Sequence, residues 1–155
     1  RALRHLIDHS WIHLNVEWRD LTTEQWGHHV QTFQGRDIEA RETPWMRAKE
    51  VWCHAVDLSP AGSYRDFPPD VLAGIGRDVL GSWERRGETP DVTLRLQDGP
   101  AGVGAAPDSD TVIVGRGGPV VSGTRADIVR WLAGRGARRL ATGGVGALPE
   151  LPRWF

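Results

Sequence analysis

Apolar residues recur every three to four positions through the first part of the chain, which is the spacing of amphipathic helices. The pattern predicts three helices, over residues 3–18, 43–58 and 69–85. The first needs partner helices to cover its apolar face. Thr43 and Pro44 are residue types preferred at the N-cap and first position of a helix, and Gly87 suits a C-cap.

Residues 21–41 lie between the first two helices and follow a less regular pattern. Thr22 to Glu24 can start a short helix that runs through Trp26, and Val30 to Phe33 form a brief extended piece. The sequence Gln34-Gly35-Arg36 indicates a turn.

The period changes from helical to extended after residue 89. Strands are predicted over residues 92–96, 111–114 and 119–121, with a loop over 98–110. A helix over 124–133 and an extended tail over 148–155, which packs back on its domain, complete the pattern. We therefore expect an α+β chain with a helical domain, 1–88, and a small α/β domain, 89–155.

Composition excludes several classes of protein. The 155 residues are 39% hydrophobic and 25% charged, with a formal net charge of -1, so neither a nucleic-acid surface nor a basic membrane-docking surface is indicated. No apolar run approaches the roughly 20 residues that span a bilayer. Cys53 is the only cysteine, which rules out an intrachain disulfide and makes a cytoplasmic setting the expectation.

Three histidines on the first predicted helix, His5, His9 and His13, are spaced four residues apart. Imidazoles at this spacing can share a metal ion, but the outer two would lie about 12 Å apart along the helix. At most two neighbouring ones can bind one ion. A polar helix face is the simpler interpretation.

The second helix carries the main candidate chemistry. Glu50 and His54 lie four residues apart, so both side chains point to one side of the helix and can reach one zinc ion. The same spacing also gives ordinary surface pairs. Cys53 points away from His54 and suits a small core position, whereas Asp57 can hydrogen-bond the imidazole or lie in a surface turn.

The run Glu42-Thr43-Pro44-Trp45-Met46-Arg47-Ala48-Lys49-Glu50-Val51-Trp52-Cys53-His54-Ala55-Val56-Asp57-Leu58 closely resembles the metal-binding helix of mycothiol-dependent maleylpyruvate isomerases. The resemblance continues upstream and downstream and covers nearly the whole chain. The further matching segments are residues 9–10, 16–19, 26–28, 34–36, 133–136 and 148–155.

This resemblance implies a fold and a set of site residues. A DinB-like helical bundle binds zinc through a histidine on an early helix and through the residues matched by Glu50 and His54. A small domain similar to sterol-carrier folds follows, and Arg135 matches its active-site arginine. The early helix is expected upstream of Arg1, so we expect an N-terminally truncated member with an incomplete zinc site.

The implied reaction is the cis–trans isomerisation of maleylpyruvate to fumarylpyruvate with mycothiol as thiol cofactor. Zinc would favour the thiolate, and Arg135 would hold a carboxylate of the small dicarboxylate substrate. Without the resemblance, Arg135 can equally be a surface residue in a helix-ending turn. A mycothiol S-transferase and a non-catalytic binding module are the alternatives. The oligomeric state and the exact substrate stay open.

Overall fold

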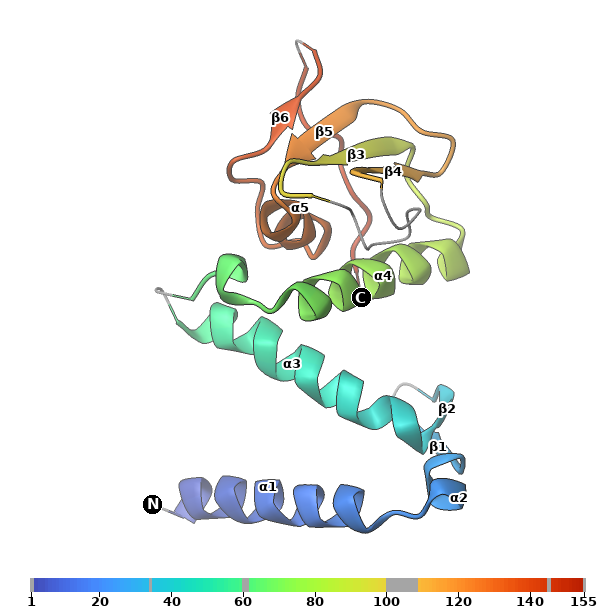
Figure 1. The fold of residues 1–155 in the computed structure, drawn as a ribbon, viewed down its shortest axis with the longest axis vertical. Helices are drawn as coiled ribbons and strands as arrows, with labels where there is room; N and C mark the ends of the chain where they lie inside the picture. The colour runs from blue at the N-terminus through green and yellow to red at the C-terminus, as the bar shows by residue number, and fades with distance from the viewer. Residues whose placement is uncertain (1, 34, 60–61, 100–108, 145, 155) are drawn as a thin grey trace. The chain divides into compact units, whose positions relative to one another are not determined.

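The computed structural model describes residues 2–33, 35–59, 62–99, 109–144 and 146–154 (Figure 1). The chain forms two compact units, residues 1–50 and 51–155, and each is described by itself. Helix α4 (Pro69–Arg86) falls in the second unit because it packs against helix α5 (Arg125–Leu132). The two domains expected from the sequence, residues 1–88 and 89–155, remain a prediction.

The first unit is mainly helical. Its elements are α1 (Ala2–Asp20), α2 (Thr23–Trp26), β1 (His29–Gln31), β2 (Asp37–Glu39), the 3-10 helix η1 (Ala40–Glu42) and the first half of α3 (Thr43–Leu58). A capping box starts α2: the Thr22 hydroxyl accepts from the Gln25 backbone, and the Gln25 side chain accepts from the Thr22 backbone. The long first helix and the short second one are thus confirmed.

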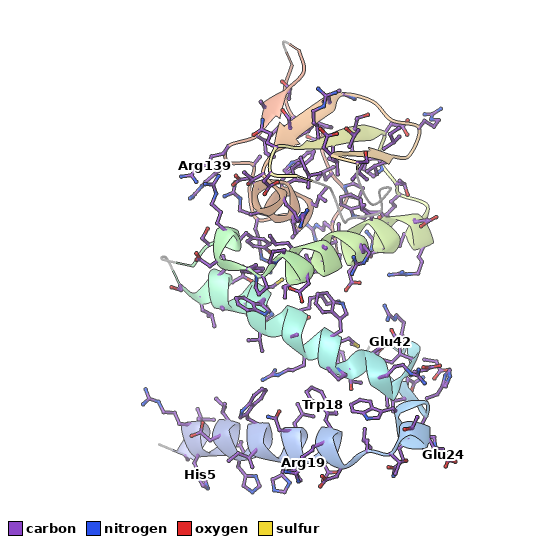
Figure 2. All side chains as sticks on the ribbon, in the orientation of Figure 1. His5, Trp18, Arg19, Glu24, Glu42 and Arg139 are labelled. Atoms are coloured by element: carbon purple, nitrogen blue, oxygen red, sulfur yellow. The ribbon has the colours of Figure 1, made fainter. Side chains whose placement is uncertain are left out.

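The apolar side of α1 is only partly covered within the chain. Leu6, Ile7 and Trp11 are 51–63% exposed, and together with Ser10, Leu14 and Arg47 they line an open groove of about 370 Å³. Trp18 lies towards the other end of the helix (Figure 2), and its indole donates to the Thr43 hydroxyl at 3.1 Å.

Helix α3 begins differently from the N-cap prediction. Thr43 has helical torsion angles, φ -64° and ψ -36°, because the 3-10 turn η1 leads directly into the helix. Its hydroxyl donates to the Ala40 carbonyl at 2.7 Å, so Thr43 belongs to the helix instead of capping it from outside. The predicted end at Leu58 is confirmed.

The second unit is built on a mixed four-stranded sheet. The strand order is β4 (Thr111–Val114), β3 (Val92–Leu96), β5 (Val120–Gly123) and β6 (Ala141–Thr142). β3 runs antiparallel to β4 and parallel to β5, with Leu94 opposite Val112 on one side and Val121 on the other. β3 alternates buried and more exposed positions, so its buried side chains form one layer of the core.

Helices complete this core. α5 packs against α4, β3, β5 and the 3-10 helix η2 (Tyr64–Asp66). The innermost side chains, all below 2% exposed, include Ile75, Val79, Trp83, Val92, Leu94, Val121, Val129 and Leu132. The result is an α+β fold, as the change of period predicts.

The C-terminal tail packs on α4, as expected for an aromatic extended segment. Trp154 is buried, its carbonyl accepts from the Ser82 hydroxyl at 3.0 Å, and the Arg153 carbonyl accepts from the Trp83 indole at 3.0 Å. These bonds anchor the tail beside the buried face of the helix.

Some expectations lie outside the described residues: Gln34 in the turn, residues 100–108 of the loop and Phe155 in the tail. Strands β2 and β6 are found where none was predicted. Among the described residues, no helix is both long enough and apolar enough to cross a membrane.

Candidate active site

Glu50 and His54 lie on one continuous helix, α3, four positions apart along the chain. Both are exposed, and the His54 side chain retains 61% of its accessible surface. Helical geometry brings positions four apart to the same side of the helix. The residues therefore have the chemistry and the spacing of two zinc ligands.

The His54 ring makes a contact that bears on its metal-binding atom. Its Nδ1 lies 3.2 Å from Oδ2 of Asp57, one turn further along α3. An ionised carboxylate only accepts hydrogen bonds, so Nδ1 carries the proton in this contact. In the neutral ring, Nε2 then keeps its lone pair, the arrangement in which a histidine that binds metal usually donates its other N–H to a carboxylate.

Asp57 is held in turn by Arg135, 78 positions further along the chain. Arg135 donates through Nε to Oδ1 at 2.8 Å and through Nη2 to Oδ2 at 2.7 Å, a two-pronged pair. Its Nη1 also donates to the Ala133 carbonyl at 3.1 Å. The chain His54–Asp57–Arg135 therefore joins α3 to the segment after α5.

This pairing shifts the ionisation of both partners. The hydrogen bonds from Arg135 hold the pKa of Asp57 below its usual value, against a smaller opposing effect of burial. The same bonds raise the pKa of Arg135. Asp57 is consequently ionised at neutral pH, as its role as an acceptor for His54 requires.

The backbone end of α5 positions Arg135. The Gly134 N–H donates to the Trp131 carbonyl at 2.9 Å and the Arg135 N–H to the Arg130 carbonyl at 3.0 Å, the two bonds of a Schellman motif. Gly134 has φ 74°, in the left-handed region that favours glycine. Arg135 thus lies in the turn that ends α5 and also contacts Asp57 of α3.

An aromatic cluster lies beneath this part of α3. Tyr64 stacks on Phe67 at 4.5 Å between ring centres, and Trp52 lies 5.0 Å from Phe67. The Tyr64 hydroxyl contacts Cys53 Sγ at 3.8 Å, and both residues are buried. Burial raises the pKa of Tyr64, and Cys53 has the small core position that the helix pattern predicts.

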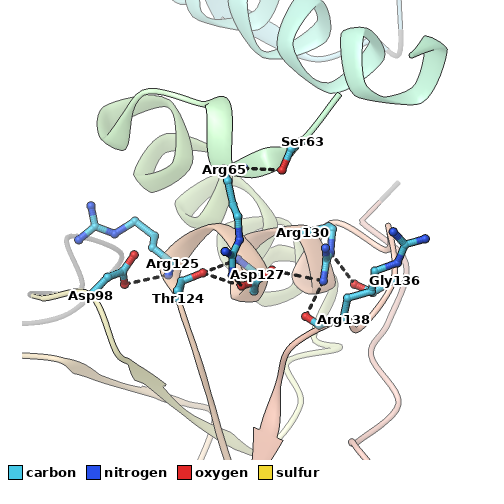
Figure 3. A network of polar contacts seen from close by, with 9 residues as sticks. All are labelled: Ser63, Arg65, Asp98, Thr124, Arg125, Asp127, Arg130, Gly136 and Arg138. Carbon is cyan, nitrogen blue, oxygen red and sulfur yellow. Dashed lines mark hydrogen bonds and ion pairs between the residues drawn. The ribbon is translucent and has the colours of Figure 1, made fainter. Parts of the chain in front are cut away.

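A second polar network holds η2 against the start of α5 (Figure 3). Asp127, 2% exposed, accepts from Arg65 at 2.6 Å and from the Thr124 hydroxyl at 2.7 Å, and lies 3.5 Å from Arg130. Burial would raise the pKa of Asp127, but the bonds from Arg65 and Thr124 outweigh it and hold the pKa below its usual value. The network fixes the helix whose end carries Arg135.

The described residues do not form a complete metal-binding cluster by themselves. No group of three or more His, Cys, Asp or Glu side chains able to hold a metal ion occurs in the described parts of the chain. On α1 the ring centres of His5 and His9 lie 6.3 Å apart and those of His9 and His13 4.4 Å apart, on an exposed face. These rings line one polar side of the helix.

The sequence predicts the Asp57–His54 contact as one of two alternatives, but it does not predict the pairing of Asp57 with Arg135. Helical spacing contains the first signal, since the residues are three positions apart. The second depends on how the end of α5 packs near α3, and spacing along the chain contains no signal for it. The sequence also gives no signal for Tyr64, because its segment has no periodic pattern of apolar residues.

Comparisons with known proteins agree on one family. The model of the mycothiol maleylpyruvate isomerase N-terminal domain matches residues 1–59. A crystal structure of the mycothiol-dependent maleylpyruvate isomerase is similar over 99% of this chain, with 37% identity and a TM-score of 0.80. A histidine-to-alanine mutant of that isomerase matches equally well, with the same identity, coverage and TM-score.

The chain spans 60% of the length of these solved structures. None of the curated protein sequences matches it. The likeness nevertheless covers both the helical part and the small sheet domain at an identity well above that of a shared fold alone. The chain is thus similar over nearly its whole length to a mycothiol-dependent maleylpyruvate isomerase, and its first 59 residues match the N-terminal domain model of that family.

Proposed function

We propose that the protein carrying this chain isomerises maleylpyruvate to fumarylpyruvate with zinc and mycothiol. The observation that carries the proposal is the linked set His54–Asp57–Arg135, which lies on the helix whose sequence resembles the family's metal-binding helix. It unites a zinc-binding residue type with a cation suited to a carboxylate. Zinc would activate the thiol, and the cation would bind a carboxylate, when a thiol adds to a dicarboxylate.

Glu50 and His54 would supply two of the metal's protein ligands, a carboxylate and an imidazole. Catalytic zinc sites commonly use three protein ligands, so a further ligand must complete the set. Zinc would favour the thiolate of mycothiol, whose reversible addition to the activated double bond permits rotation about it.

Arg135 would bind a carboxylate of the substrate. Its three hydrogen bonds to Asp57 and Ala133 use three of the five N–H groups of a guanidinium. The other two are proposed to donate to the substrate and to stabilise negative charge that develops beside its carboxylate. The pairing with Asp57 holds the guanidinium in one orientation, which lowers the cost of ordering it during the reaction.

Transfer of mycothiol to an electrophile is the alternative enzyme activity. It would use the same metal helix, and only the substrate separates the two reactions. A non-catalytic module would have no need of zinc.

The test is an assay of the full-length zinc-loaded protein with maleylpyruvate and mycothiol, followed by chromatography of the two geometric isomers. We expect fumarylpyruvate to form, mycothiol to be recovered unchanged, and no turnover when mycothiol is omitted. Stoichiometric consumption of mycothiol with an electrophile, and no isomer exchange, would support the transferase instead. Inactivity in both assays would favour a function as a non-catalytic binding module.

A further inference from the structure

Asp57 occupies a position between two residues that the proposed function uses. Its Oδ2 is shared: it accepts from Arg135 Nη2 at 2.7 Å and lies 3.2 Å from His54 Nδ1. Its Oδ1 accepts from Arg135 Nε at 2.8 Å. Because the guanidinium binds both oxygens, the plane of the Asp57 carboxylate is fixed. The direction from which Oδ2 contacts the His54 ring is therefore fixed as well.

The arrangement determines which tautomer of His54 is favoured. A carboxylate paired with a guanidinium is ionised and has no proton to give, so the His54 ring must donate from Nδ1. A neutral ring with Nδ1 protonated presents its lone pair at Nε2. The opposite tautomer would place a lone pair of nitrogen against a lone pair of oxygen.

We propose that Asp57 is a positioning residue that, held by Arg135, fixes His54 in the Nδ1–H tautomer and leaves Nε2 as the atom that binds a ligand. Arg135 thereby acts on His54 through Asp57, in addition to its proposed contact with substrate. The consequence for zinc rests on the proposed function, whereas the tautomer does not.

The chain offers a matched control pair. His29 Nδ1 lies 2.8 Å from Asp37 Oδ2, and the two side chains are 60% and 69% exposed. This histidine–carboxylate contact belongs to the β1–β2 hairpin, where no arginine contact to Asp37 is described. Asp37→Asn therefore removes the same kind of bond without touching α3.

The experiment is long-range proton–nitrogen NMR of the metal-free protein at a pH of about 8.5, where an ordinary imidazole is neutral. The parent should show His54 mainly as the Nδ1–H tautomer. Asp57→Asn should shift the population towards Nε2–H, because the amide can donate to Nδ1, and Asp57→Ala should give a mixture. Asp37→Asn should leave His54 unchanged.

A parent protein with His54 mainly as Nε2–H, or an Asp57→Asn variant with unchanged His54 nitrogens, would overturn the proposal. Zinc competition with a chromophoric chelator is the second readout. Loss of a hydrogen-bond partner behind a metal ligand typically costs about 10- to 100-fold in affinity, and we expect that loss for Asp57→Asn and none for Asp37→Asn. The expected tautomer shift without any zinc binding by the parent would contradict the proposed function alone.

Discussion

The guanidinium of Arg135 makes several hydrogen bonds in one plane, a geometry that a point charge cannot reproduce. Its flat fork pairs both oxygens of Asp57 while its third nitrogen reaches the Ala133 carbonyl. A lysine ammonium can approach one oxygen at a time and has no fixed plane. The identity of the cation at this position, beyond its charge, should therefore affect catalysis.

Arg135→Lys tests that requirement. We expect zinc to be retained, because Glu50 and His54 are unchanged and a lysine can still pair with Asp57 behind His54, and isomerase activity to fall by about one to two orders of magnitude. That range corresponds to loss of a charge-assisted hydrogen bond worth roughly 1.5–3 kcal/mol in the transition state. Steady-state kinetics at saturating mycothiol measure it.

The matched control is Arg116→Lys. Arg116 also pairs with a carboxylate, since its Nε and Nη2 both donate to Oδ2 of Asp91, at 3.0 and 2.7 Å, but its side chain is 91% exposed and lies in the turn after β4. Its replacement should leave the kinetics unchanged. Parent-like rates for Arg135→Lys would confine Arg135 to a structural role.

The buried carboxylate of Asp127 predicts a pH dependence of stability. Its pKa in the folded protein lies below the unfolded value of about 3.9, so its stabilising contribution is present above about pH 4 and is lost as the pH falls through the folded pKa. Asp127→Asn should lower the free energy of unfolding at pH 7 by roughly 1–3 kcal/mol. The loss should fall towards the lower end of this range, because Arg65 is partly exposed and solvent screens its interaction with Asp127. The deficit should shrink in acid.

Urea unfolding at pH 7 and pH 3 measures the effect, with Asp20→Asn as control. Asp20 pairs with its neighbour Arg19 on the surface, where both side chains are more than half exposed, and its replacement should change stability little. A deficit for Asp127→Asn that is equal at both pH values would disprove the ionic origin of its contribution.

Two helices of the second unit end in the same motif. α4 ends at Gly87, with φ 67°, and bonds from Gly87 to Glu84 and from Glu88 to Trp83 repeat the pattern seen after α5. A Cβ at Gly87 or at Gly134 would meet nothing within 4 Å. The backbone strain of an alanine is thus comparable at the two sites, but only Gly134 precedes Arg135.

Gly134→Ala and Gly87→Ala should each cost about 1–2 kcal/mol of stability, the price of a left-handed alanine. Only Gly134→Ala should also reduce isomerase activity, because it disturbs the turn that presents Arg135. Thermal unfolding and kinetics on both variants separate the effects. Equal activities at equal stability loss would show that this turn does not position the arginine.

At the level of elements, the long periodic segments were predictable, whereas the short strands β2 and β6 were not. α1, α3 and α4 each extend over at least sixteen residues, long enough for the apolar spacing to be clear. β2 has three residues and β6 two, too few for an alternation to appear. They form because Ile38 pairs with Val30 and Thr142 with Val121, contacts that local sequence does not specify.

The residues of the candidate site also differ in how far local sequence predicts them. Glu50, His54 and Asp57 lie within one helix, so their spacing alone indicates shared chemistry. Arg135 entered through the resemblance to the family and not through any local pattern. Its contact with Asp57 is a product of tertiary packing in the second unit.

For the whole molecule, the residues proposed to act on metal and substrate come from α3 and from the turn after α5. The aromatic cluster around Phe67 and the Asp127 network stabilise the segments that carry them. In the proposed function, this framework serves a zinc enzyme. Zinc content should therefore depend on α3 and not on histidine–carboxylate pairs elsewhere.

The most direct measurement is the zinc content of the full-length protein after exhaustive dialysis, for the parent, His54→Ala and His29→Ala. Both histidines are carboxylate-paired and about 60% exposed, so neither change should unfold the chain. We predict stoichiometric zinc in the parent and in His29→Ala, and its loss in His54→Ala with an unchanged circular dichroism spectrum. Full zinc content in a folded His54→Ala protein would contradict the account.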